Sequence, residues 1–206
     1  MPAVRSDATD EMLMIRYQRG DRQSFAELIG RHGPRVYNFA LRQLRDESLA
    51  QGVTQATFLH LVQNAAQFKN EARFSTWLYA IVRRLCVAHE RRRSDEPERS
   101  PDQAAPDSRS VARAPSSVLT SLAPDGALER SVVSSQVGAS IVRVLDDLPD
   151  DQREVFLMRE VANLPFEDIA SITESALETV KTRMRYALDR LRDALSNFEE
   201  YTRALR

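Results

Sequence analysis

The sequence predicts an all-α protein with two small helical domains joined by a flexible linker, the second domain containing a helix-turn-helix. Apolar residues recur three and four positions apart over most of the chain, which is the period of an amphipathic helix, and no sustained alternation typical of strands is present. This pattern stops at residue 94 and returns at residue 139. We therefore expect domains at 1–93 and 139–206 and a linker at 94–138.

Five helices are expected in the first domain. The segment DEMLMIRYQRG has Asp10 as its N-cap and Gly20 as its stop. Asp21 caps SFAELIGRHG, and Pro34 is typical of the first turn of a further helix, VYNFALRQL. The helix ESLAQGVTQATFLHLVQNA follows. The last helix is RFSTWLYAIVRRLCVAHERRR, whose apolar stripe consists of Leu78, Ile81, Leu85 and Ala88.

The composition changes at residues 94–138, which contain five prolines, many serines and no aromatic residue. Such a segment buries too little apolar surface to offset its chain entropy, so a flexible linker is expected. Its 45 residues can extend to roughly 150 Å and average about 35–40 Å as a coil.

Four helices are expected in the second domain, at about 139–147, 150–162, 166–172 and 176–196. Pro149 and Pro165 mark helix starts, with acidic residues in the first turns. The short break before the last helix predicts a helix-turn-helix. The expected core face of that helix consists of Leu177, Val180, Met184, Leu188, Leu191 and Leu195.

Charge is unevenly distributed although the net formal charge is only -1. Residues 31–93 contain 11 basic and 4 acidic residues, whereas residues 141–180 contain 3 basic and 10 acidic residues. Residues 181–192 are again basic, with 5 basic residues and 1 acidic residue. Blocks of this kind build separate fields on separate surfaces. The interleaved aromatic and arginine residues of 74–93 therefore suit either a solvated helix face or a surface for an anionic partner.

The last helix carries polar residues near its start, including Lys181, Thr182, Arg185 and Tyr186, away from its apolar face. A recognition helix places its N-terminal residues against base edges in the major groove, and basic side chains there contact phosphate or guanine. Spacing alone leaves a second interpretation open, a solvated amphipathic helix that ends a bundle.

Several other classes of protein are disfavoured. A single cysteine, Cys86, excludes an internal disulfide framework and fits a reducing cytoplasm. No apolar run is long enough to span a bilayer, and the N-terminus lacks the apolar core of a signal peptide. Cys86 and His89 are too few ligands for a zinc site. Glycine-rich phosphate loops and nucleophile motifs are absent, so neither a cofactor nor an enzymatic activity is expected.

Both halves resemble one family, the bacterial extracytoplasmic-function (ECF) sigma factors of the sigma-70 type. The segment 145–195 is similar to their region 4, through Leu148-Pro149, Arg153, Val155, Leu157-Met158-Arg159, Phe166-Glu167-Asp168-Ile169-Ala170 and Thr179-Val180-Lys181-Thr182-Arg183. The stretches GDRQSFAELIGRHGPRVYNFALRQL and FKNEARFSTWLYAIVRRLCVAHERRR resemble their region 2. The resemblance implies a protein that binds core RNA polymerase, recognises a promoter and helps to open it.

The resemblance also implies the functional residues. Opening DNA requires a flipped base to be held by aromatic and cationic side chains. The expected contacts to the −10 element are Phe68, Lys69, Asn70, Arg73, Phe74, Trp77, Tyr79, Arg83 and Arg84. The expected contacts to the −35 element are Lys181, Thr182, Arg183, Arg185, Tyr186 and Arg153. Gln55 and Phe58 are expected on the polymerase, and an anti-sigma factor is an implied partner that would hold a compact form with its basic surfaces covered.

The chain departs from the family pattern at three positions that bear on function. Gly52 and Ala56 stand where the family has an aspartate and a glutamate that face the polymerase, and Glu174 replaces a glycine in the helix-turn-helix, which is expected to reshape the turn. Two alternatives follow: a polymerase adaptor with weakened core binding, or a dimeric helix-turn-helix regulator, which would leave the aromatic residues of 68–79 without a role.

Overall fold

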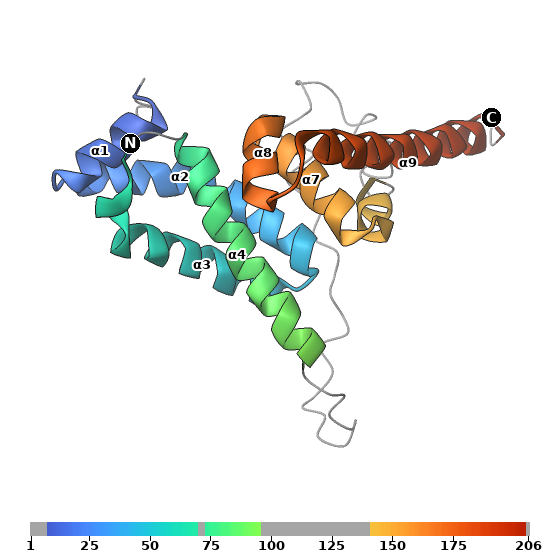
Figure 1. Ribbon diagram of the computed structural model, residues 1–206. Helices are drawn as coiled ribbons and strands as arrows, with labels where there is room; N and C mark the ends of the chain where they lie inside the picture. The colour runs from blue at the N-terminus through green and yellow to red at the C-terminus, as the bar shows by residue number, and fades with distance from the viewer. Residues whose placement is uncertain (1–7, 70–72, 96–140, 205–206) are drawn as a thin grey trace, which may run out of the picture.

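The computed structural model describes residues 8–69, 73–95 and 141–204, and these residues form helices and no strand, which confirms the all-α prediction. Figure 1 shows α1 to α4 as one group of helices, with α8 beside α4 and α9 extending away toward the C-terminus. Residues 141–147 are also helical. The labelled helices are α1 (Asp10–Gln18), α2 (Arg22–Leu44), α3 (Glu47–Gln63), the short 3-10 helix η1 (Ala65–Gln67), α4 (Phe74–Asp95), α7 (Asp150–Glu160), α8 (Phe166–Thr173) and α9 (Leu177–Ala204).

The capping residues of α1 differ by one position from the sequence prediction. Thr9, not Asp10, is the N-cap, since its hydroxyl accepts from the Met12 amide at 3.3 Å. Asp10 lies inside the helix and accepts from Arg31 at 2.9 Å and from His32 at 2.6 Å. Although partial burial opposes the shift, these hydrogen bonds and positive charges lower the pKa of Asp10. The Asp10 cluster therefore ties α1 to α2.

The predicted break at Pro34 is wrong, because α2 continues through the proline. A proline inside a helix removes one hydrogen bond and crowds the carbonyl four residues earlier, here that of Gly30. Pro34 is exposed, so its ring lies on the solvent side of the helix and not in the core. Leu28, Val36 and Phe39 are fully buried on either side of the proline, and their burial favours one continuous helix.

The two halves share a hydrophobic core. One contiguous cluster joins Leu28 and Phe39 of α2 to Leu78 of α4 and to Val155 and Ile169 of α7 and α8. Residues 141–148 pack separately against α9 through Leu145, Leu148, Ala187 and Leu191. Ser94 and Asp95 of the expected linker extend α4, and the remaining linker lies outside the described residues.

Polar contacts cross the same interface. The Arg83 Nε of α4 donates to Glu154 Oε1 of α7 at 2.9 Å, and its Nη1 donates to the carbonyl of Ile172 at 3.3 Å. Thr76 donates to Asp168 Oδ2 of α8 at 2.5 Å. Acidic residues of the second half thus cover the Arg83 side of α4. Most basic residues of α4 and of the start of α9 remain exposed, so the expectation of a compact form with covered basic surfaces is met only in part.

The turn of the helix-turn-helix has the left-handed backbone conformation that glycine favours, although the residue there is a glutamate. Glu174 has φ 54° and ψ 37°, the left-handed conformation that ends α8. The Ser175 amide donates to Ala170 at 3.0 Å and the Glu174 amide to Ser171 at 3.4 Å, which together form a Schellman motif. The turn is therefore not reshaped, contrary to the sequence expectation. The expected core face of α9 also needs correction, because Leu188 is 42% exposed while Ala187 is buried.

Glu174→Gly is expected to stabilise the protein by up to about 1 kcal/mol, because a side chain in the left-handed conformation costs roughly 1–2 kcal/mol and glycine recovers part of that. Urea unfolding followed by circular dichroism measures the change. Glu174→Ala is the matched control, since it retains a Cβ at the strained position and should give no gain. A gain of equal size in both variants would contradict this account of the turn.

Glu154 should give stability a specific dependence on pH. Burial raises the pKa of Glu154 above its ordinary value of 4.5, and the Arg83 charge only partly opposes the shift. The folded state therefore binds a proton at Glu154 more tightly than the unfolded state does. Its contribution is fully present below pH 4.5 and is lost as pH rises through the raised pKa.

The free energy of unfolding of the wild type minus that of Glu154→Gln is therefore expected to fall between acidic and neutral pH. Using the glutamine variant as the reference cancels the titration of all other groups. Urea unfolding at a series of pH values gives this difference. A difference that grows as pH rises would contradict the assignment of the raised pKa to Glu154.

Candidate nucleic-acid interface

The loop before α4 is held by α1. The Gln18 side-chain amide donates to the carbonyl of Ala65 at 2.7 Å and to that of Phe68 at 2.9 Å. The first amide of α4, that of Phe74, donates to Glu11 Oε1 at 2.9 Å, so a carboxylate from another helix caps this helix start. These contacts fix where the aromatic residues of 68–77 lie.

Phe68, Phe74 and Trp77 form one aromatic cluster. The Phe68 ring lies 5.3 Å from Trp77 and 6.0 Å from Phe74, measured between centroids. Phe68 and Phe74 are buried, whereas Trp77 is half-buried at the edge of the cluster. Only Trp77 of the three therefore presents ring surface to solvent in this arrangement.

Tyr79 belongs to the core rather than to a DNA-binding surface. It is fully buried, packs edge-on against Phe39 at 5.5 Å, and burial raises the pKa of its hydroxyl. The family resemblance implies DNA contacts for Phe68, Phe74 and Tyr79, but in the structure all three are packing residues. An aromatic residue in a helix pattern does not by itself reveal whether it faces the core.

One face of α4 combines Trp77 with exposed cations. Arg73, Trp77, Arg84 and Arg91 follow one another at intervals of four, seven and seven residues, which places them on a single helix face. The three arginines are exposed, and Lys69 is exposed just before the helix. Asn70 lies outside the described residues. We call Lys69, Arg73, Trp77, Arg84 and Arg91 the α4 solvent face.

Arg83 lies on a different side of α4, where it pairs with Glu154 as described above. Its side chain is 27% exposed, and its guanidinium group already forms an ion pair with the Glu154 carboxylate. Arg83 is therefore an interface residue in this arrangement and does not extend the α4 solvent face.

The start of α9 presents a second cationic surface. Lys181, Arg185 and Tyr186 are exposed and Thr182 is half-buried, while Val180 and Met184 bury the opposite side against α7 and α8. The Arg185 guanidinium carbon lies 5.6 Å from the centroid of the Tyr186 ring, which is cation–π distance. Lys181 Nζ donates to Glu178 at 2.8 Å. We call Lys181, Thr182, Arg185 and Tyr186 the α9 surface.

Two arginines expected on DNA have structural partners instead. Arg153 is 2% exposed, donates to the Leu148 carbonyl at 3.1 Å and pairs with Asp150, so it does not lie on a surface that is open to duplex DNA. Arg183 pairs with Asp151 at 2.9 Å and donates to Ser175 Oγ at 3.1 Å, joining α9 to α7 and to the turn. A basic residue in a motif can hold the motif together rather than bind the ligand.

Helix α3 exposes an apolar surface that sequence reasoning missed. Gln55 is exposed as expected, and Phe58 is half-buried, edge-on to Phe25 at 6.5 Å. Leu59 and Val62 lie four and seven residues after Gln55 on the same helix face and are 55% and 42% exposed. Ile29 of α2 is also exposed. The signal was present in the sequence, since ATFLHLV contains more apolar residues than one buried stripe needs.

No helix among the described residues is both long and apolar enough to cross a bilayer, nor do those residues contain a cluster of three or more metal-ligating side chains.

Comparison with known families gives two matches in the expected order. Sigma-70 region 2 matches residues 28–96, and Sigma-70 region 4 matches residues 139–191. Together they cover more than half of the chain, and each falls on one of the two helical halves, the first match starting within α2. The α4 solvent face lies in the first match, and the α9 surface lies in the second.

Curated relatives match along nearly the whole chain. The RNA polymerase sigma-H factor of Pseudomonas aeruginosa is 27% identical over 186 residues, covering 90% of this chain and 93% of its own. The ECF RNA polymerase sigma factor SigW of Bacillus subtilis is 27% identical over 179 residues, covering 86% of this chain and 92% of its own. The chain is thus similar to these proteins in both halves and in total length.

Two solved structures share the fold. The sigma factor RpoE of Bartonella quintana, crystallised with the anti-sigma factor NepR, matches with a TM-score of 0.63 and 24% identity over 84% of this chain and 98% of its own. CnrH in complex with the cytosolic domain of CnrY matches with a TM-score of 0.60 and 17% identity, over 92% of this chain and 99% of its own.

The helical fold, the two region matches in order and the full-length relatives agree with one another. The chain belongs to the ECF sigma factors of the sigma-70 family, and its function is promoter-directed initiation of transcription with RNA polymerase.

Proposed function

We propose that the α4 solvent face contacts the opened −10 element of the promoter. The observation that carries this proposal is the placement of half-buried Trp77 between exposed arginines on one helix face. The Trp77 ring packs against Phe68 at a tilt, which restricts its orientation, and a base can stack on its exposed side. Arg73 and Arg84 lie on either side along the helix and can neutralise the phosphates of the same strand. Exposed Lys69 adds a further cation before the helix, and Asn70, which lies outside the described residues, stays an expected contact.

The α9 surface is assigned to the duplex at the −35 element. Lys181, Arg185 and Tyr186 project from the first turns of the second helix of a helix-turn-helix, the part that enters a major groove. Arg185 offers a planar donor pair suited to guanine, and Lys181 and Thr182 suit phosphate or base edges. Arg153 and Arg183 hold this domain together and serve the contact indirectly.

The packed arrangement of the two halves is proposed to open on the polymerase. A promoter spacer of ~17 base pairs at about 3.4 Å each separates the two elements by some 60 Å, whereas α7 and α8, which carry α9, lie directly against the first half in this structure. Separation breaks the Arg83–Glu154 pair and frees Arg83 for DNA, the role expected from the sequence.

The exposed apolar surface of α3 is proposed as the main polymerase contact. Gln55, Phe58, Leu59 and Val62 present apolar surface beside the positions at which this chain lacks the family's two acids. Burial of exposed leucine and valine side chains contributes roughly 1.5–3 kcal/mol each, which can offset two absent surface ion pairs of about 0–1 kcal/mol each.

Acting with core RNA polymerase places the protein in the cytoplasm, and no residue is assigned a catalytic role. The RpoE structure contains the anti-sigma factor NepR, and the CnrH structure contains the cytosolic domain of CnrY, which supports an anti-sigma factor as a partner of this chain as well.

Trp77→Ala is expected to weaken binding of polymerase holoenzyme to forked −10 DNA by about fivefold to a hundredfold, the loss of one base stack. Tyr186→Ala is the matched control, since it removes an exposed ring from the α9 surface and should leave this DNA unaffected. On duplex DNA that carries only the −35 element, Tyr186→Ala should weaken binding and Trp77→Ala should leave it unchanged. Fluorescence anisotropy with both DNAs measures them, and equal losses from both variants on both DNAs would exclude the division of labour.

Gly52→Asp is expected to tighten binding to core polymerase by about twofold to fivefold, through one restored surface charge. Gly52→Ala is the control that distinguishes the effect of the added charge from the effect of the higher helix propensity. A Cβ at Gly52 meets nothing within 4 Å, so alanine should stabilise α3 by about 1 kcal/mol without tightening the complex. Titration against labelled core polymerase tests both variants, and promoter-specific transcription in vitro tests the function itself. A protein that never supports transcription would favour the adaptor alternative.

A further inference from the structure

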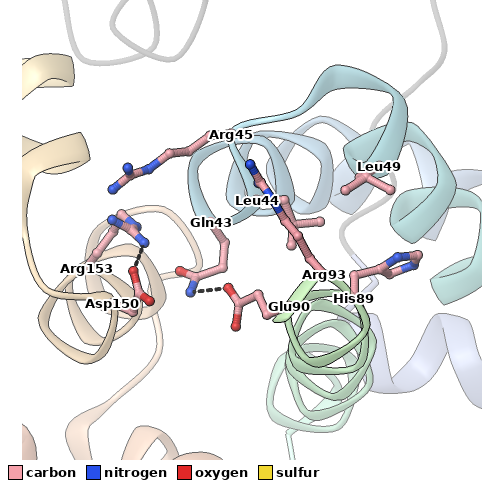
Figure 2. Close-up of a pocket in the computed structure, with 9 residues that line it drawn as sticks. All are labelled: Gln43, Leu44, Arg45, Leu49, His89, Glu90, Arg93, Asp150 and Arg153. Atoms are coloured by element: carbon pink, nitrogen blue, oxygen red, sulfur yellow. Dashed lines mark hydrogen bonds and ion pairs between the residues drawn. The ribbon is translucent and has the colours of Figure 1, made fainter. Parts of the chain in front are cut away.

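A polar pocket lies between the two halves of the chain, away from the α4 solvent face and the α9 surface. It has a volume of about 160 Å³ and forms where the ends of α2 and α4 meet the starts of α3 and α7. Figure 2 shows the residues that line it: Gln43, Leu44, Arg45, Leu49, His89, Glu90, Arg93, Asp150 and Arg153. The first half supplies seven of them and the second half supplies Asp150 and Arg153.

The lining carries a positive charge. The lining contains three guanidinium groups, those of Arg45, Arg93 and Arg153, and two carboxylates, those of Glu90 and Asp150. Asp150 pairs with Arg153, and Glu90 accepts from the Gln43 amide nitrogen at 3.1 Å. Arg45 contacts a neutral group, the carbonyl of Asp146, and within the described residues no carboxylate pairs with Arg93. In Figure 2 the guanidinium groups of Arg45 and Arg153 lie on the same side of the pocket.

Two buried polar atoms in this lining lack a partner among the described residues. They are Gln43 Oε1 and Arg153 Nε, in side chains that belong to residues only 6% and 2% exposed. Buried groups of this kind are nearly always satisfied, by protein, water or ligand. The hydrogen bond to Glu90 fixes the orientation of the Gln43 amide, so its oxygen is turned toward Arg153 and Asp150 (Figure 2).

These groups specify the chemistry of a ligand. The guanidinium groups favour an oxyanion, which they bind through charge-assisted and bidentate hydrogen bonds. Gln43 Oε1 can only accept, so it favours an oxyanion that carries a hydroxyl group. Hydrogen phosphate has both features at neutral pH, whereas sulfate has no hydroxyl. A cavity of about 150 Å³ holds a molecule the size of benzene, so the pocket suits a single phosphoryl group and not a whole nucleotide.

We propose that this pocket is a binding site for phosphate, held by Arg45 and Arg93 of the first half, Arg153 of the second half and the amide oxygen of Gln43. The phosphoryl group comes either from inorganic phosphate, whose own hydroxyl donates to Gln43 Oε1, or from a small phosphate monoester such as glycerol 3-phosphate, in which a carbon-bound hydroxyl takes that role. Because the site is complete only when both halves are packed together, bound phosphate stabilises the packed arrangement by mass action. This inference does not depend on the assignment of the DNA-binding surfaces.

Isothermal titration calorimetry on the full chain tests the site, at constant ionic strength and neutral pH, with three probes: inorganic phosphate, glycerol 3-phosphate and sulfate. Saturable binding of one phosphate, at least about tenfold tighter than sulfate, is expected, together with a rise in melting temperature. Tighter binding of glycerol 3-phosphate than of inorganic phosphate identifies a phosphorylated molecule as the source, and the reverse order identifies free phosphate.

Arg93→Ala is expected to weaken phosphate binding by about tenfold or more, the loss of a charge-assisted hydrogen bond. The matched control is Arg92→Ala, which removes an exposed arginine one position away that does not line the pocket. Gln43→Leu should reduce the preference for phosphate over sulfate. Both arginines are exposed, so unchanged circular dichroism is expected. Absence of saturable phosphate binding, equal affinity for sulfate, or equal losses in the two arginine variants would overturn the proposal.

Discussion

The arrangement of the molecule depends on one buried ion pair, Arg83 with Glu154, set into an apolar core that both halves share. Apolar burial supplies the drive for association but tolerates many orientations. An ion pair in a mostly buried site tolerates few orientations, because a buried charge that loses its partner destabilises the protein by about 3–5 kcal/mol. Together with Thr76 and Asp168, this pair fixes the register of α4 against α7 and α8.

The pair also divides the surface of α4 into two faces with different roles. The side that carries Thr76 and Arg83 is covered by acidic residues of the second half, and the side that carries Arg73, Trp77 and Arg84 remains accessible. The same basic helix thus serves packing in the free protein and DNA contact in the proposed complex. The sequence is basic in the first half and acidic at the start of the second, and these opposite charges attract each other where α4 meets the second half.

The sequence predicted the helical class, most helix ends and the helix-turn-helix because these follow from local chemistry, such as the cap at Asp21 and the prolines before α7 and α8. It failed where packing decides. The period of the apolar residues defines the buried face of a helix only to within about one residue in either direction. Leu188, which was predicted to be buried, is therefore exposed, and its neighbour Ala187 is buried. Tyr79, which was predicted to contact DNA, is also buried. Arg153 looks like a DNA contact in a motif, but the carbonyl that it binds is visible only in the fold. Pro34 was overridden by apolar burial on both sides.

The central claim is that the two halves are packed together in the free protein and separate on the promoter. Spin labels at Gln63→Cys in α3 and Arg190→Cys in α9 report their separation by pulsed electron paramagnetic resonance. The native Cys86 is buried, and burial together with nearby Glu90 and Glu154 raises its pKa to about 12, so it should resist labelling. We predict one narrow distance in the free protein and a markedly longer one in the complex with polymerase and promoter. A broad distribution in the free protein, or an unchanged distance in the complex, would contradict the claim.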